Sequence, residues 1–228
     1  MKGLTSVKLE RPQLLWLIFM FLAACTHAPN DVRTPLIGYD PPILEYHFDT
    51  SATDWDTFHL PENQAAFSLS DNALLGQVAA NMGYIWSLNH RPLTDLSVRV
   101  DSQQLRGSVG NGFGIICRAD ADGNGYYFVV SSAGAFAILK AQPSIPNPIE
   151  LVKWQNSPAV KTGDAVNRIE TLCVKNYLGF IINGILIAET NDSTLPNGQF
   201  GLVLGAVEQP LSIKFDNVII REVRVIGG

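Results

Sequence analysis

Apolar and polar residues alternate in many short stretches after residue 42, and this period of two is typical of β-strands with one buried face. Stretches rich in β-branched and aromatic residues recur at close intervals. The predicted strands are Ile43–Phe48, Ala66–Leu69, Ala73–Ala79, Leu96–Asp101, Gly112–Ala119, Tyr126–Ser131, Ala135–Ala141, Ile149–Trp154, Asn167–Lys175, Gly179–Ile182, Ile185–Glu189, Gln199–Leu204 and Leu211–Val225. Because no stretch there keeps a helical period, the pattern predicts an all-β domain.

Turn-forming residues separate the predicted strands at 122–125, 133–134, 183–184 and 196–198. The pair Asn183–Gly184 is the clearest, because a type I′ hairpin turn needs two residues that accept positive φ. Many short strands joined by such turns predict a sandwich or a barrel.

The N-terminal segment has a different pattern. Lys2, Lys8 and Arg11 form a basic opening, and an unbroken apolar run follows from Leu14 to Ala24. That run is much shorter than the roughly 20 residues that a membrane-spanning helix needs. A basic region followed by a short apolar region and small residues predicts a secretory signal peptide over residues 1–24.

The end of the apolar run reads Leu22, Ala23, Ala24, Cys25. It resembles the lipobox of bacterial lipoproteins, in which an aliphatic residue and two small residues precede the cysteine that receives diacylglycerol. The resemblance implies lipidation at Cys25 and a membrane anchor of several acyl chains, which hold a protein stably. Thr26 is not the aspartate that retains many lipoproteins in the inner membrane, so we expect the outer membrane or the cell surface of a bacterial cell envelope.

Residues 25–42 are predicted to form a lipidated tether. Pro29, Pro35, Pro41 and Pro42 interrupt a mixed polar stretch, so no helix or strand is expected there. A proline-stiffened chain of this length extends up to about 50 Å. The folded domain is therefore expected to span residues 43–228.

Charge limits the range of partners. The chain has 16 Lys+Arg and 21 Asp+Glu, for a net charge of −5. Loss of the predicted signal peptide removes more basic than acidic residues and leaves the rest more acidic. An acidic protein without a basic cluster is a poor candidate for binding nucleic acid, so no nucleic acid partner is expected.

A series of aromatic and glycine-containing features follows a fixed order along the domain. They are Phe48–Asp49, Trp55, Tyr84–Trp86, Leu96–Val100, Asn111–Arg118, Gly125–Val130, Gly134–Leu139, Trp154, Ser157–Pro158, Asn167–Ile169, Ile182–Gly184, Gly198–Gly201 and Phe215–Asn217. Together they resemble the concanavalin A-like jelly rolls, the fold of legume lectins, laminin-G modules and laminarinase-like hydrolases. The resemblance covers residues 43 to 225 and implies a two-sheet antiparallel jelly-roll sandwich.

The same fold carries both binding modules and enzymes, so function has to be argued from the site. Laminarinase-like members use a Glu-x-Asp-x-x-Glu motif, whose carboxylates act as nucleophile and general acid. No segment has this motif: Glu45 and Asp49 have the wrong spacing, and Glu170 and Glu189 stand alone. We therefore expect no catalysis, although a hydrolase with an unrecognised site remains an alternative.

Four residues are candidates for ligand binding: Trp86, Arg118, Tyr127 and Trp154. In Gly125–Ser131 the alternation puts Tyr127 on the outer side of its strand, where an aromatic ring can contact a sugar. Structural roles compete with this reading. Trp86 and Trp154 could pack in the fold, and Arg118 could pair with an acidic residue across strands.

The resemblance also implies a possible structural Ca²⁺ between the first and last strands, with Asp49 and Asp216 at suitable places. Asp216 could equally cap a turn. The stretch 120–125 superficially resembles a calcium loop but lacks the closing glutamate, so a hairpin turn is the better interpretation.

Two cysteines follow Cys25. Alternation points Cys117 and Cys173 inward, so they could form a disulfide in an oxidising compartment or remain two buried thiols.

Three functions follow from these expectations. The first is a non-catalytic, surface-tethered module that binds glycan or a cell-envelope polymer. The second is an assembly lipoprotein that binds an envelope protein, and the third is the hydrolase with an unrecognised site.

Overall fold

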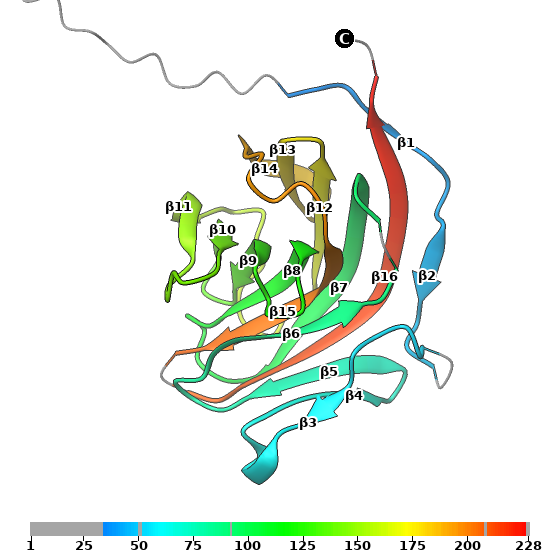
Figure 1. Cartoon of the computed structure of the whole chain (residues 1–228). Helices are drawn as coiled ribbons and strands as arrows, with labels where there is room; N and C mark the ends of the chain where they lie inside the picture. The colour runs from blue at the N-terminus through cyan, green and yellow to red at the C-terminus, as the bar shows by residue number, and fades with distance from the viewer. Residues whose placement is uncertain (1–33, 50–51, 92, 208, 227–228) are drawn as a thin grey trace, which may run out of the picture. The chain divides into compact units, whose positions relative to one another are not determined.

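Two antiparallel β-sheets pack face to face and form the two layers of the domain (Figure 1). The computed structural model describes residues 34–49, 52–91, 93–207 and 209–226. In this part of the chain the only helical element is the short 3-10 helix η1 (Pro61–Asn63). Among these same residues no helix is long and apolar enough to cross a membrane. The predicted all-β class and the two-sheet sandwich are therefore confirmed.

The larger sheet has ten strands. Eight of them lie in the order β14 (Ile185–Asn191), β13 (Tyr177–Ile182), β12 (Asn167–Val174), β7 (Leu96–Arg106), β16 (Leu211–Val225), β5 (Ala73–Val78), β4 (Ala65–Ser70) and β3 (Phe58–His59). The long strand β16, red in Figure 1, pairs with β5 through its first half. Its second half pairs with β2 (Leu44–Tyr46) and β1 (Ile37–Tyr39), which complete the sheet.

The smaller sheet has six strands, and it carries the candidate site described below. Their order is β11 (Ile149–Asn156), β10 (Ala135–Ala141), β9 (Gly125–Ser131), β8 (Gly112–Ala119), β15 (Gln199–Ala206) and β6 (Gly83–Asn89). Strands β11 and β6 are thus its two edges, and β8 lies near its centre.

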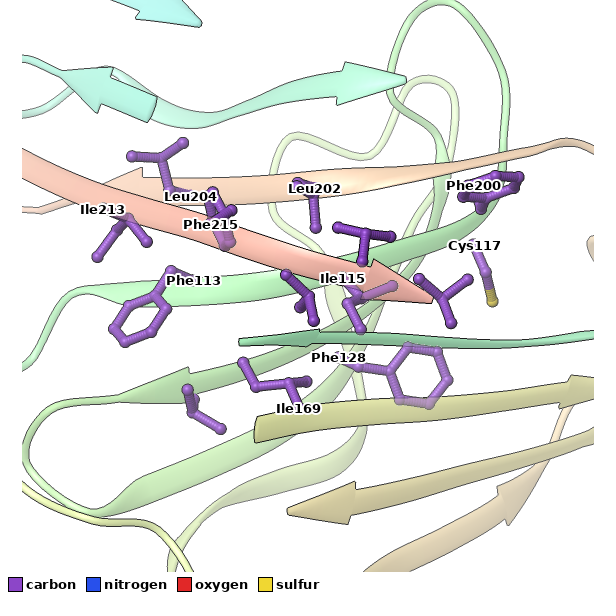
Figure 2. Close-up of a cluster of buried hydrophobic side chains, with 14 of the residues drawn as sticks. Phe113, Ile115, Cys117, Phe128, Ile169, Phe200, Leu202, Leu204, Ile213 and Phe215 are labelled. Carbon is purple, nitrogen blue, oxygen red and sulfur yellow. The ribbon is translucent and has the colours of Figure 1, made fainter. Parts of the chain in front are cut away.

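The main core lies between the sheets, where alternate residues of facing strands meet (Figure 2). Phe113 and Ile115 of β8 and Phe128 of β9 come from the smaller sheet, and Ile213 and Phe215 of β16 come from the larger one. Each of these side chains is at most 1% exposed. Burial of a large apolar side chain stabilises a fold by about 1.5–3 kcal/mol, so this layer is the main source of stability.

The bounds of β8, β10 and β16 match the prediction, but β6 was missed as a strand. Its inward positions include Ser87 and Asn89, which are fully buried. Ser87 Oγ donates a hydrogen bond to the Asp56 carbonyl at 2.7 Å, and Asn89 Nδ2 donates to Tyr46 Oη at 3.1 Å. Because these polar residues face the core, the hydrophobic alternation of β6 is hidden in the sequence.

The expectation that no strand forms before residue 43 is wrong for Ile37–Tyr39. These residues form β1, which pairs with Val223–Val225 of β16. Ile37 also packs against an apolar cluster on the outer side of the larger sheet, formed by Leu172, Val174, Tyr177 and Val223. Pairing with the edge of β16 and packing on this apolar cluster stabilise β1. The strand was not expected from the sequence because prolines lie on both sides of it. The predicted signal peptide, the lipidation site Cys25 and residues 26–33 lie outside the described residues.

Cys117 and Cys173 form a disulfide in the structure, with their Cα atoms 6.9 Å apart. Cys117 lies on β8 of the smaller sheet and Cys173 on β12 of the larger one, so the bond links the two layers. It closes a segment with a sequence separation of 56, which in the chain-entropy account is worth about 4 kcal/mol.

Candidate functional site

Four aromatic residues lie on the outer side of the six-stranded sheet, which faces away from the main core. Ile85 faces that core, so its neighbours Tyr84 and Trp86 point outward from β6. Tyr127 points outward from β9. Trp154 of β11 reaches the same side, as its contact with Gly112 shows. We call these four residues the aromatic face.

Glycine on the central strands makes room for the aromatic rings. A Cβ added to Gly112 of β8 would lie 2.8 Å from Tyr84 Oη and 3.3 Å from the Trp154 ring. One added to Gly205 of β15 would lie 2.7 Å from the Tyr84 ring. Tyr84 and Trp154 come from the opposite edges of the sheet, and their side chains converge over Gly112, the first residue of the central strand β8.

An apolar layer lies beneath the aromatic rings. It consists of Leu88, Ile116, Ala119, Tyr127, Val129, Ala137, Leu139 and Val203, with Tyr84, Trp86 and Ala141 packed against it. Trp154 remains 37% exposed, and Tyr84 and Trp86 are partly exposed. The residues of the layer itself are at most 4% exposed, so Tyr84, Trp86 and Trp154 are the parts of the aromatic face that a ligand can contact.

Tyr127 supports the face from below. It is only 2% exposed, and its hydroxyl donates a 2.6 Å hydrogen bond to the Gly123 carbonyl. Its ring meets that of Tyr84 edge-on at a centroid distance of 5.2 Å. Burial raises the pKa of Tyr84 to about 12 and also raises the pKa of Tyr127. Both hydroxyls are protonated at neutral pH, and since that of Tyr127 is already bonded to Gly123, Tyr84 is the tyrosine that can donate to a ligand.

Trp86 packs against the turn between β8 and β9. A Cβ on Gly123 would lie 2.6 Å from the Trp86 ring, so the close approach needs glycine there. Asp120 holds the turn, because its Oδ1 accepts hydrogen bonds from the backbone N–H groups of Asp122 and Asn124, each at 3.0 Å. The stretch is thus a hairpin turn, which is the interpretation that the sequence favoured.

Arg118 lies away from the other three candidates. Its side chain is 1% exposed, with Nη2 3.4 Å from Asp95 Oδ1, and Nη1 donates to the Leu195 carbonyl at 3.3 Å. Its backbone has φ +53°, and the β8–β15 pairing shifts register nearby. This irregularity turns the side chain inward, where it bonds the loop that carries Leu195. The structure therefore does not bring Arg118 to the aromatic face.

The carboxylates suggested for Ca²⁺ lie near each other in the topology, because β2 and β16 pair. Asp216 Oδ1 accepts a 2.7 Å hydrogen bond from the backbone N–H of Asn217. Within the described ranges no group of three or more His, Cys, Asp or Glu side chains is placed to hold a metal ion. The calcium pair Asp49 and Asp216 stays a prediction.

The fold defines this domain as a jelly-roll β-sandwich, and solved structures share it. A carbohydrate-binding module from Bacillus subtilis, CBM66, matches with a TM-score of 0.60 and 18% identity, over 75% of this chain and 98% of that one. A Bacillus subtilis protein of unknown function with a galectin-like fold matches with a TM-score of 0.62 and 14% identity, over 82% of this chain and 99% of that one.

The catalytic domain of a laminarinase from Thermotoga petrophila RKU-1 also matches, with a TM-score of 0.57 and 8% identity, over 82% of this chain and 99% of that one. No protein-family model matches the sequence. No curated protein matches it either. At these identities the structural matches establish the fold of the domain.

Tyr84 is the residue of the aromatic face that sequence reasoning did not select. Its signature was present, because Tyr84 and Trp86 are two positions apart and must share one side of a strand. Because residues 83–89 were not predicted to form a strand, the shared side of Tyr84 and Trp86 was not recognised.

Proposed function

We propose that this domain is a non-catalytic carbohydrate-binding module and that the aromatic face is its binding surface. The observation that carries the proposal is the convergence of Tyr84 and Trp154 over Gly112. The apolar side of a sugar ring packs on such aromatic rings, and a tyrosine hydroxyl can bond the sugar hydroxyls beside it.

Two of the structural matches support a glycan ligand. One of them is a carbohydrate-binding module and another is the catalytic domain of an endo-1,3-β-glucanase. The sequence lacks the Glu-x-Asp-x-x-Glu motif of the laminarinase-like enzymes, which favours binding over cleavage.

The proposal also includes a lipid anchor at Cys25 and a position in the bacterial cell envelope. The lipobox-like residues 22–25 support the anchor. The Cys117–Cys173 disulfide supports export, because disulfides persist in oxidising compartments outside the cytoplasm. Metabolic labelling with a fatty-acid analogue tests the anchor: the wild-type chain is expected to be labelled, and Cys25→Ala is expected to lose the label.

A glycan array tests the function. The full chain in detergent is screened beside Trp154→Ala and, as a matched control, Leu60→Ala, since Leu60 is 41% exposed and lies outside the aromatic face. We expect binding by the wild type and by Leu60→Ala, and a loss of about tenfold or more for Trp154→Ala. Absence of binding to every glycan would contradict the proposal, and an envelope protein would then become the preferred partner.

A further inference from the structure

A second site lies on the outer side of the other sheet. There the ten-stranded sheet carries a hollow of about 490 Å³ that is open to solvent. Its polar lining comprises Arg99, Asp101, Lys161, Arg168, Glu170 and Asn183. The volume falls within the roughly 300–1,000 Å³ of ordinary small-molecule sites.

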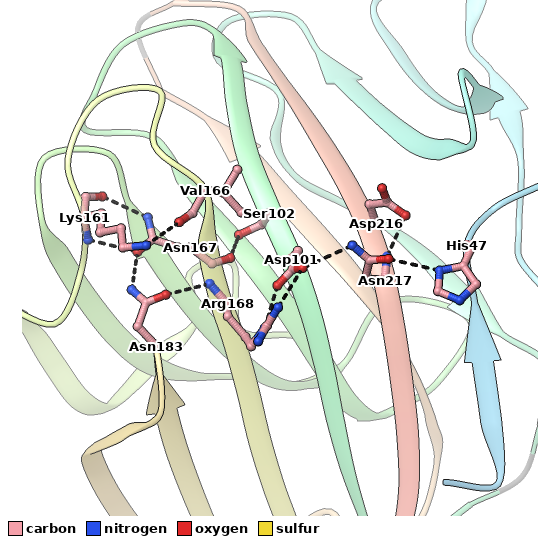
Figure 3. A network of polar contacts seen from close by, with 10 residues as sticks. All are labelled: His47, Asp101, Ser102, Lys161, Val166, Asn167, Arg168, Asn183, Asp216 and Asn217. Carbon is pink, nitrogen blue, oxygen red and sulfur yellow. Dashed lines mark hydrogen bonds and ion pairs between the residues drawn. The ribbon is translucent and has the colours of Figure 1, made fainter.

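One wall of the hollow is a loop held by two asparagines (Figure 3). Buried Asn167 accepts a 2.9 Å hydrogen bond from the Lys161 backbone N–H through Oδ1 and donates to the Lys161 carbonyl at 2.8 Å. Asn183, in the β13–β14 turn, donates to the Ala159 carbonyl at 2.8 Å and to Asn167 Oδ1 at 2.9 Å. The backbone of Lys161 is therefore fixed at the rim before any ligand arrives.

Asp101 in the hollow is already neutralised. Arg168 donates to both of its carboxylate oxygens, from Nε at 2.8 Å and from Nη2 at 3.1 Å. Asn217 Nδ2 adds a bond to Oδ2 at 3.2 Å. Burial by itself raises the pKa of Asp101, but the hydrogen bonds from Arg168 and Asn217 outweigh it and lower the pKa.

Two cations in the hollow are not neutralised in this way. Among the described residues neither Arg99 nor Lys161 forms an ion pair. The Lys161 ammonium donates a 3.4 Å hydrogen bond to the Val166 carbonyl. Glu170 is paired opposite Arg99 between β12 and β7, but it accepts its 2.7 Å hydrogen bond from Ser97 Oγ.

We propose that this hollow binds a sugar that carries one carboxylate, such as a uronic acid unit of an acidic polysaccharide. Lys161 and Arg99 bind the carboxylate, and Glu170 accepts hydrogen bonds from the hydroxyls of the ring. Two acidic side chains in the lining and a chain charge of −5 disfavour a ligand with several negative charges, so a single carboxylate among hydroxyls fits best. This site does not depend on the function of the aromatic face, which lies on the other layer.

Calorimetric titration of the full chain with galacturonic acid, galactose and acetate tests the proposal. We expect saturable binding of galacturonic acid, at least about tenfold weaker binding of galactose and of acetate, and weakening by added salt. Lys161→Gln and Arg99→Gln are each expected to reduce the affinity about fivefold or more. Arg106→Gln is the matched control, because it removes the same charge from the same strand β7 outside the hollow.

Trp154→Ala separates the two sites, since it should leave galacturonic acid binding unchanged. No saturable binding of galacturonic acid by the wild type would overturn the proposal. Equal affinity for galactose or acetate, or unchanged binding in the Lys161→Gln, Arg99→Gln double variant, would overturn it as well. The comparison of galacturonic acid with galactose is repeated on Trp154→Ala, so that sugar binding at the aromatic face does not contribute to it.

Discussion

Lys140 and Asp192 form a nearly buried ion pair at one end of the sandwich. Lys140 Nζ lies 2.7 Å from Asp192 Oδ2, and their side chains are 9% and 12% exposed. Asp192 Oδ1 also accepts hydrogen bonds from Tyr126 Oη at 2.6 Å and from the Thr194 N–H at 2.8 Å. Burial by itself raises the pKa of Asp192, but the bonds from Lys140, Thr194 and Tyr126 outweigh it and hold the pKa far below its ordinary value of 3.8.

The lowered pKa of Asp192 predicts an acid-sensitive contribution to stability. The contribution is complete above the unfolded pKa and is lost as the pH falls toward the folded one. Asp192→Asn should lower the free energy of unfolding at pH 7 by about 3 kcal/mol, since it leaves a buried lysine without its partner. Guanidinium unfolding between pH 7 and pH 3 measures this. The wild type should lose stability below about pH 4, and the variant should lose less.

Asp122→Asn is the control for that experiment, because Asp122 is exposed in the β8–β9 turn. Equal stability of Asp192→Asn and wild type at pH 7, or parallel pH profiles, would contradict the role assigned to the ion pair.

Substitution by alanine is expected to affect ligand binding at one glycine of β8 and stability at another. A Cβ on Gly112 would meet the ends of the Tyr84 and Trp154 side chains, which can move. A Cβ on Gly114 would lie 2.0 Å from the carbonyl oxygen of Phe128, which is fixed in the sheet. We expect Gly112→Ala to fold normally and bind glycan several-fold more weakly, and Gly114→Ala to unfold at lower temperature. Thermal unfolding and glycan titration of both variants check this, and normal binding by Gly112→Ala would count against the aromatic face.

Individual residues also explain why the site was only partly predictable. Alternation correctly placed Tyr127 on the outer side of β9. It could not place Trp154, because a bulge sets Lys153 and Trp154 of β11 opposite the single residue Ala137 of β10. It also could not place Arg118, whose positive φ interrupts the period of two. Such irregularities depend on pairing partners that the local sequence does not specify.

At the scale of elements, the disulfide between β8 and β12 joins the two sheets. Reduction is expected to lower the free energy of unfolding by about 4 kcal/mol. Chemical unfolding with and without reductant measures the change. The Cys117→Ser, Cys173→Ser double variant is the control and should not respond to reductant. If reductant leaves the wild type unaffected, the cysteines do not form this bond in the protein.

Strand order is the part of the fold that the sequence could not supply. The long alternating segment Leu211–Val225 was predicted as one strand, yet its central place between β7 and β5 follows only from the sheet. The same holds for β6 and β11, whose positions at opposite edges bring Tyr84 and Trp154 together. Long-range pairing therefore creates the candidate site from residues that are distant in sequence.

At the scale of the whole domain, the two layers present different outer surfaces. The six-stranded sheet carries aromatic rings over glycine and a buried apolar layer. The ten-stranded sheet carries a polar hollow with two cations that lack ion-pair partners in the described part of the chain. The main core lies between the sheets, and the exposed side chains on both outer surfaces are available for binding. We propose that the first surface binds the apolar faces of neutral sugars and that the second binds an acidic sugar.

The most direct test of the central claim is the affinity of Trp154→Ala for the glycan that binds the wild type best. Calorimetry on the wild type, Trp154→Phe, Trp154→Ala and Leu60→Ala gives the comparison, with thermal unfolding as a check on folding. We expect that Trp154→Phe retains most of the affinity, that Trp154→Ala loses about tenfold or more, and that Leu60→Ala binds as the wild type does. Full affinity in a folded Trp154→Ala variant would contradict the aromatic face as the binding surface.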